Sequence, residues 1–183
     1  VELCASAEWA ANPTPITNDE ELRAARNPYE VELTERLQAE SAVLVKNENN
    51  LLPLSKDAKV YVTGTSKDTI AMDAEAISAY AAVVEDIEEA DVVVAHVTAM
   101  DDSTEMFIED AQDEEKPLVL LFDGGVSNEP NAWVIENSGA VLFLTYDCTP
   151  DHGSSMGNFY HKTLPSVLAD MLYGVKAPSG KTV

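Results

Sequence analysis

Hydrophobic residues form short unbroken runs from residue 59 onward, and acidic stretches with helical character lie between the runs. This alternation is typical of βα units around a mostly parallel sheet. Because the runs are continuous, both faces of the sheet are expected to be covered by helices. The predicted strands are Lys59–Thr63, Ala81–Glu85, Asp91–Val97, Pro117–Phe122 and Ala140–Tyr146. The pattern therefore predicts an α/β fold with a doubly wound sheet.

Helices are predicted in the segments between and after these strands. They are Asp68–Ala79, Asp86–Ala90, Ser103–Asp113, Pro130–Asn137 and Asn158–Tyr173. Earlier in the chain, Pro28 opens a helix whose apolar side runs to about Glu40, and the segment Ser41–Val45 that follows is expected to be buried. Residues 1–27 read as a polar arm with one short helix. We expect an N-terminal arm with helices over 1–39 and the α/β domain over 40–183.

Charge narrows the range of partners. The 183 residues include 33 acidic and 11 basic ones, a formal charge of −22. The field of such a protein repels nucleic acid and anionic lipid, so neither is expected as a partner. The longest apolar stretches, Leu118–Phe122 and Ala140–Leu144, are far shorter than a membrane-spanning helix.

Cysteine and histidine spacing gives no sign of a metal or cofactor. Cys4 and Cys148 are the only cysteines, and they lack the CxxC spacing of zinc or thioredoxin-type sites. A disulfide between them and two separate buried thiols both stay open. His96 lies on an apolar strand and is interpreted as a core or strand-end residue, while His161 is expected on a helix surface. No metal and no cofactor are expected.

Candidate chemistry is expected after the strands, because ligands of open α/β sheets bind outside the carboxyl ends of the strands. Gly64–Lys67 joins a strand to a helix with small and hydroxyl residues and could hold a phosphate, although it lacks a glycine fingerprint. The next loop carries Asp101, Asp102 and Glu105, which could supply a general acid or a cation site. Chance proximity of acids is the competing interpretation for such an acidic protein.

The two later loops are less specific. Asp123–Glu129 contains a glycine pair that suits a pocket or a simple strand-to-helix turn equally well. Asp147–Ser155 contains Cys148 and His152, but no nucleophile elbow surrounds the cysteine. A catalytic cysteine is not expected.

Several motifs in register resemble the C-terminal α/β sandwich domain of family 3 glycoside hydrolases. Glu40–Leu54 (ESAVLVKNENNLLPL), followed by Lys59–Gly64, looks like the start of that domain, and Leu164–Lys181 (LPSVLADMLYGVKAPSGK) is similar to its end. Ala90–Val94 matches its ADVVVV strand, and Pro117–Gly125 lies where its next strand and turn belong. The resemblance implies a three-layer α/β/α sandwich with a mostly parallel sheet of five or six strands.

The same resemblance implies retaining hydrolysis of carbohydrate, with an Asp nucleophile on a TIM-type barrel and, in many members, a Glu acid/base after the ADVVVV strand. By position, the resemblance implies Glu105 as the acid/base and Asp101 and Asp102 as substrate-binding residues. The segment Met100–Met106 keeps a glutamate but lacks the Gly and Asp-Arg common in the family. A chain of this length has no room for a barrel, so the isolated chain is predicted to be inactive.

Three classes of function follow. The leading one is the sandwich domain of a family 3-type β-glycosidase that needs a barrel domain or a partner chain. The alternative is a non-catalytic structural, assembly or carbohydrate-binding module, and a weaker third is a flavodoxin-like phosphate or nucleotide binder. Val1 in place of Met fits a mature product or a fragment of a longer protein. A secreted or periplasmic location is expected, and a homo-oligomer is conceivable.

Overall fold

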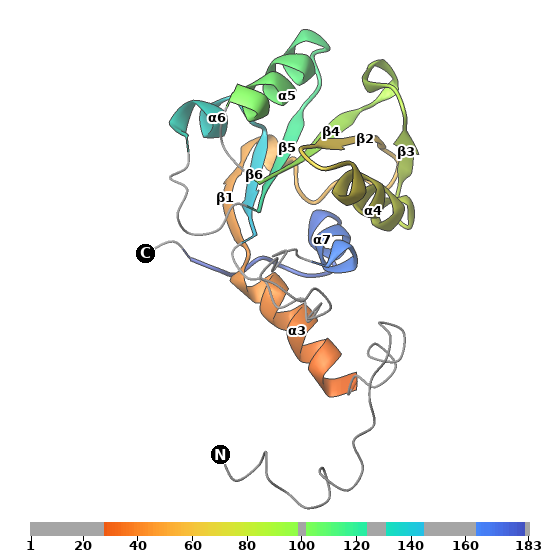
Figure 1. Ribbon diagram of the computed structural model, residues 1–183, viewed down its shortest axis with the longest axis vertical. Helices are drawn as coiled ribbons and strands as arrows, with labels where there is room; N and C mark the ends of the chain where they lie inside the picture. The colour runs from red at the N-terminus through yellow and green to blue at the C-terminus, as the bar shows by residue number, and fades with distance from the viewer. Residues whose placement is uncertain (1–27, 99–101, 124–130, 145–163, 182–183) are drawn as a thin grey trace, which may run out of the picture.

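The computed structural model describes residues 28–98, 102–123, 131–144 and 164–181. These residues form a six-stranded sheet with the order β1-β6-β5-β4-β2-β3 (Figure 1). The strands are β1 (Val43–Asn47), β2 (Lys59–Gly64), β3 (Ala82–Val84), β4 (Val92–Val97), β5 (Leu118–Phe122) and β6 (Ala140–Phe143). Neighbouring strands run parallel except β1, which pairs antiparallel with β6 at one edge.

Helices cover both faces of the sheet: α4 (Lys67–Ser78) and α7 (Pro165–Leu172) lie on one face, and α5 (Asp102–Asp113) and α6 (Ala132–Glu136) lie on the other. The first helix, α3 (Pro28–Ser41), packs against α7 and extends away from the sheet (Figure 1). Two 3-10 turns, η2 (Glu48–Asn50) and η3 (Ile87–Glu89), lie in the connections. Alternate residues of the central strand β4 enter different cores: Val92 and Val94 pack with α4 and α7, and Val93 and Ala95 pack with α5 and α6. The three-layer α/β/α sandwich is thereby confirmed. Every helix in the described ranges is too short or too polar to cross a membrane.

The predicted elements agree with the structure where a strand is buried on both faces of the sheet, and they differ elsewhere. All five predicted strands are present, and four of them differ from the prediction by at most one residue at each end. The strand β6 ends at Phe143, and the last two residues of its predicted range lie outside the described residues. The segment taken as a buried run after the first helix instead contains the edge strand β1, in which Leu44 and Val45 are exposed. The helix expected over Asp86–Ala90 is only the single turn η3, because the short connection from β3 to β4 leaves no length for more. The part of Asn158–Tyr173 before residue 164 lies outside the described residues.

The segment Glu40–Leu54, the first of the motifs that carry the family resemblance, makes contacts that hold the fold together. The Asn47 side chain donates to the carbonyl of Leu52 and accepts from its amide, both at 2.9 Å, so one amide closes the loop between β1 and the buried leucines. The amide of Leu54 then donates to the carbonyl of Leu172 at the end of α7. The motif residues thus join the start of the domain to its last helix.

The second motif completes the same junction from the other end of the chain. The amide of Gly180 donates to the carbonyl of Ala42 at 2.9 Å, and a Cβ on Gly180 would lie 2.3 Å from the carbonyl oxygen of Ser41. Gly174, with φ +72, passes within contact distance of Pro53. Close backbone approach explains Gly180, and the left-handed backbone explains Gly174. The motifs that carry the resemblance therefore specify packing.

Candidate functional site

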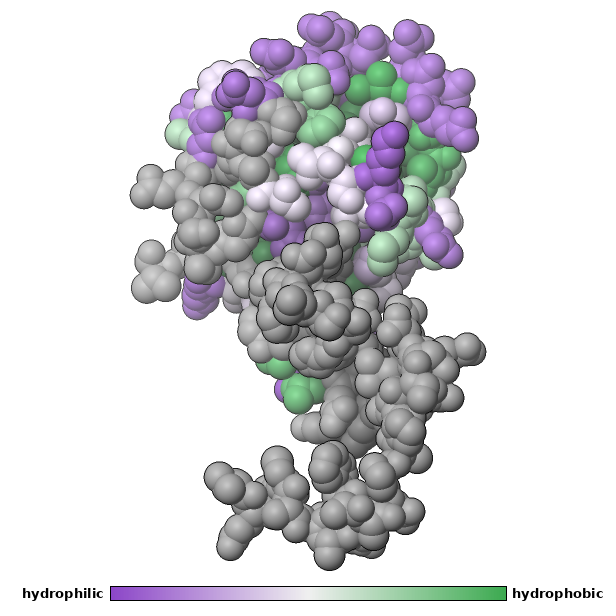
Figure 2. Space-filling model, viewed as in Figure 1, coloured by the Kyte–Doolittle hydropathy of each residue, from purple (hydrophilic) through white to green (hydrophobic). Residues whose placement is uncertain are grey.

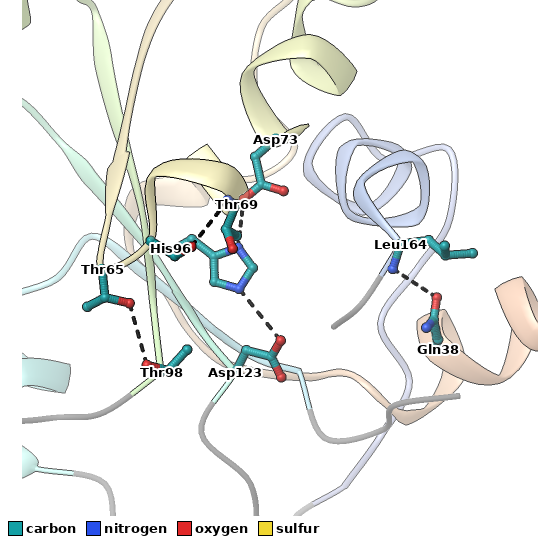
Figure 3. Close-up of polar contacts among 9 residues, drawn as sticks. Gln38, Thr65, Thr69, Asp73, His96, Thr98, Asp123 and Leu164 are labelled. Atoms are coloured by element: carbon teal, nitrogen blue, oxygen red, sulfur yellow. Dashed lines mark hydrogen bonds and ion pairs between the residues drawn. The ribbon is translucent and has the colours of Figure 1, made fainter. Parts of the chain in front are cut away.

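A buried histidine lies between two carboxylates at the carboxyl end of the central strands (Figure 3). His96 is next to last in β4, Asp73 projects from α4, and Asp123 follows β5. The ring Nδ1 of His96 lies 2.6 Å from Oδ2 of Asp73, and Nε2 lies 3.8 Å from Oδ2 of Asp123. All three side chains are at least nine-tenths buried. This Asp73–His96–Asp123 cluster ties α4, β4 and β5 together at the edge where ligands of such sheets bind.

The cluster fixes the protonation state of its histidine. Burial by itself would lower the pKa of His96, but the contacts and charges of Asp123 and Asp73 outweigh it and raise the pKa to about 9. The imidazole is therefore protonated at neutral pH, and its Nδ1–H donates to Asp73. A ring that keeps both protons cannot accept another, so His96 does not serve as a general base at neutral pH. The interpretation of His96 as a strand-end histidine with satisfied polar groups is confirmed.

Asp73 is the member of the cluster that sequence reasoning missed. The buried residues of α4 are Thr69, Asp73 and Ile77, spaced by four, so an acid stands in the middle of the face that meets the core. Figure 3 shows Thr69 beside the histidine ring, on the same side of the helix. A lone carboxylate on the apolar stripe of a helix signals a buried partner, because burying it unpaired is costly. The sequence signal for this cluster was therefore Asp73 on the apolar face of a helix, together with His96 on an apolar strand.

The loop proposed to hold a phosphate is built for chain packing. Gly64 has φ +155, and a Cβ there would lie 2.2 Å from the carbonyl oxygen of His96, so glycine is required by the neighbouring strand. The Ser66 side chain accepts the amide of Thr69 and caps α4 itself. The hydroxyl oxygens of Thr65 and Thr98 lie 3.5 Å apart at the end of β2 and β4. These contacts explain the glycine and hydroxyl residues of the loop by close packing and by the capping of α4.

Glu105 lies in the first turn of α5, with its side chain half-buried. The Asn131 side-chain amide donates to its Oε1 at 3.3 Å, and the Asn131 oxygen in turn caps α6. The helix α5 begins at Asp102, one residue before the helix predicted over Ser103–Asp113, so Glu105 lies on that helix, and Asn131 contacts its carboxylate. Asp102 is exposed at the start of the same helix, and Asp101 lies outside the described residues. Glu105 and Asp102 thus share one helical turn near the strand ends.

The remaining candidates fall largely outside the structure. Cys4, Cys148, His152 and His161 are not among the described residues, nor are the loops around them. Within the described ranges, no group of three histidine, cysteine or acidic side chains is arranged to hold a metal ion.

Comparisons with solved structures find the same sandwich within larger enzymes. A β-glucosidase from Listeria innocua matches with a TM-score of 0.63 and 20% identity, over 92% of this chain and 28% of that chain. A GH3 β-glucosidase from Bifidobacterium adolescentis matches with a TM-score of 0.61 and 17% identity, over 87% of this chain and 30% of that chain. An exo-1,3/1,4-β-glucanase from a Pseudoalteromonas species matches with a TM-score of 0.60 and 15% identity, over 88% of this chain and 32% of that chain. No protein-family model and no curated protein matches the sequence.

These likenesses confirm the fold that the sequence resemblance implied. The chain has the fold of one part of the GH3 β-glucosidases and spans under a third of their length. Fold alone carries no activity, since function depends on the residues of a site.

Proposed function

We propose that this chain is the α/β sandwich domain of a family 3-type β-glycosidase, and that it acts on carbohydrate only beside a barrel that carries the nucleophile. The observation that carries the proposal is the unequal coverage of the structural matches. They account for 86–93% of this chain but only 27–32% of each matched β-glucosidase or glucanase. The rest of each matched enzyme has no counterpart among these 183 residues.

The chemistry assigned to this chain is that of the acid/base partner. Retaining hydrolysis places two carboxyl groups roughly 5–5.5 Å apart across the sugar, one as nucleophile and one as acid/base. Glu105 is the proposed acid/base, because it lies in the first turn after the central strand β4. Asn131 holds its carboxylate from α6. A side chain fixed by a second element meets the positioning that acid catalysis requires.

A non-catalytic structural or carbohydrate-binding module is the second candidate, and one observation favours it. The contacts of the two resemblance motifs described above all serve packing, through Asn47, Leu54, Gly174 and Gly180. Such motifs would persist in a sandwich that had lost catalysis. The two candidates predict different results with a companion barrel domain: the sandwich domain of a glycosidase takes part in hydrolysis beside it, and a non-catalytic module does not.

The test compares the chain with any longer protein or partner that supplies a barrel. The full reading frame and its neighbours are expected to encode one, and the assembled enzyme is expected to hydrolyse aryl β-glucosides. In the assembled enzyme, Glu105→Gln should slow the hydrolysis of substrates with poor leaving groups far more than that of activated aryl glucosides. Only the poor leaving groups need protonation by an acid. Glu109→Gln, an exposed change on the same helix, is the matched control. Equal losses on both substrate types would remove Glu105 as the acid, and the lack of any barrel would favour the module.

A further inference from the structure

A groove opens on the α5 side of the sheet, beside β2 and away from the strand ends that carry the cluster. Its volume is about 210 Å³. The lining residues are Tyr61, Thr63, Ile87, Val93, Phe107, Asp110, Asp113 and Glu114. In Figure 2 the upper end of the molecule, where α5 and the β3–β4 connection lie, shows hydrophobic atoms bordered by hydrophilic residues. The groove is separate from Glu105, whose contact with Asn131 is on the α6 side of α5.

The groove exists because one layer of the sandwich is incomplete. The chain passes from β2 through α4 to β3 at the sheet edge, and then returns past β2 to β4. Right-handed crossovers in opposite directions lie on opposite faces, so the return belongs on the face of α5. Parallel connections normally use a helix in a crossover of a dozen or more residues, but here only η3 lies between β3 and β4. The helix that would cover β2 on this face is missing.

The exposure of β2 shows the consequence. Val60 and Val62 point toward α4 and are buried, whereas Tyr61 and Thr63 point toward the groove and stay partly exposed. Tyr61, Ile87 and Phe107 pack against the buried core and are themselves only partly buried. An apolar sheet face of this kind is ordinarily buried beneath a helix.

The charged residues along the groove indicate which kind of partner could bind there. Asp110, Asp113 and Glu114 line the α5 side, and in the described part of the chain none of them has an ion-pair partner. Among the described residues, no basic one lines the groove. Three carboxylates beside two aromatic rings favour lysine or arginine, which pair with the acids and lie over the rings. A second copy of this chain is disfavoured, because each copy carries a formal charge of −22.

We propose that this groove binds an amphipathic helix of a partner protein, with apolar side chains on Tyr61, Ile87 and Phe107 and lysine or arginine along the flank that meets α5. The bound helix takes the place of the missing crossover helix and completes the layer. The proposal does not depend on the glycosidase assignment, since it uses none of the residues assigned to hydrolysis.

The test uses labelled helical peptides of about 14 residues, roughly the mean length of a protein helix, with a leucine stripe. One peptide carries lysines on a single flank and the other carries glutamates at the same positions. Fluorescence anisotropy at low salt measures binding to the intact chain. Asp110→Lys should weaken the lysine peptide about tenfold. Glu109→Lys, an equal change of charge at a neighbouring position outside the groove, should change it less than about twofold. Thr63→Trp, which fills the groove from a partly exposed strand position, should abolish binding.

Three results would overturn the proposal. Equal losses for the two lysine substitutions would mean that peptide binding follows the overall charge. Equal affinity for the glutamate peptide would mean that the carboxylates specify nothing. A chain dimer that Thr63→Trp dissociates would assign the groove to a second copy. Thermal melting of each variant identifies any that fails to fold, and the Asp110–Glu109 pair decides the question if Thr63→Trp is such a case.

Discussion

Replacing His96 by glutamine should destabilise the fold and remove a pH dependence that the cluster creates. The substitution leaves Asp73 and Asp123 buried without the imidazolium between them. The pKa of His96 rises from an ordinary 6.5 to about 9 on folding. At 1.36 kcal/mol per pKa unit, the difference corresponds to about 3 kcal/mol. Breaking one side of a buried ion pair costs a similar amount, about 3–5 kcal/mol.

The sign of the pH dependence follows from proton binding. Between pH 6.5 and 9 the folded chain holds a proton on His96 that the unfolded chain has released. The stabilisation is therefore complete below pH 6.5 and is lost as the pH rises through 9. Within that window the contribution of His96 falls by about 1.4 kcal/mol per pH unit. The His96→Gln variant lacks this slope.

Urea unfolding of the wild type and the variant at several pH values between about 6 and 9.5 measures the effect. The difference in unfolding free energy should be about 3 kcal/mol near pH 6 and should shrink toward zero above about pH 9. Other groups that titrate in this range are common to both proteins and cancel in the difference. A gap that stays constant with pH, or one below about 1 kcal/mol near pH 6, would refute the charged cluster.

Four further outcomes are expected. Asp73→Asn should cost about 3 kcal/mol and lower the pKa of His96, seen as a downward shift of its ring titration by NMR. Gly180→Ala should lower the unfolding free energy by about 1–3 kcal/mol in urea, because its Cβ would lie 2.3 Å from the carbonyl oxygen of Ser41, whereas exposed Ser179→Ala should change it by under about 0.5 kcal/mol. Asp170→Asn should lower the unfolding free energy by about 1–2 kcal/mol in denaturant, since Asp170 accepts a hydrogen bond from the Tyr80 hydroxyl at 2.5 Å and forms an ion pair with Lys176. Glu105→Gln should leave the thermal midpoint nearly unchanged, because glutamine still accepts from Asn131; a large fall would make Glu105 a structural residue.

The sheet was predictable from sequence where strands are buried on both faces. Every residue of β4 and β5 is buried, so their sequences are nearly unbroken apolar runs. The strand β1 carries exposed Leu44 and Val45 next to Lys46, and its extended form depends on pairing with β6, which lies far later in the sequence. Local sequence does not contain that pairing.

The cluster was only partly predictable. His96 was placed correctly as a strand-end histidine, because its neighbours on β4 are all apolar. Asp73 and Asp123 are 23 and 27 residues away from it in the sequence, and only the strand order brings α4, β4 and β5 together. The helix that carries Glu105 was predicted to within one residue, but its contact with Asn131 was not, because Asn131 lies 26 residues later in the sequence, just before α6.

We propose that this chain is a sandwich domain without a nucleophile of its own. The most direct measurement is the release of nitrophenol from nitrophenyl β-glucoside by the purified 183-residue chain. No release above the uncatalysed rate is expected, because one carboxyl group without its opposing partner cannot form the glycosyl-enzyme intermediate. Steady turnover that persists through further purification and is lost in Glu105→Gln would contradict it.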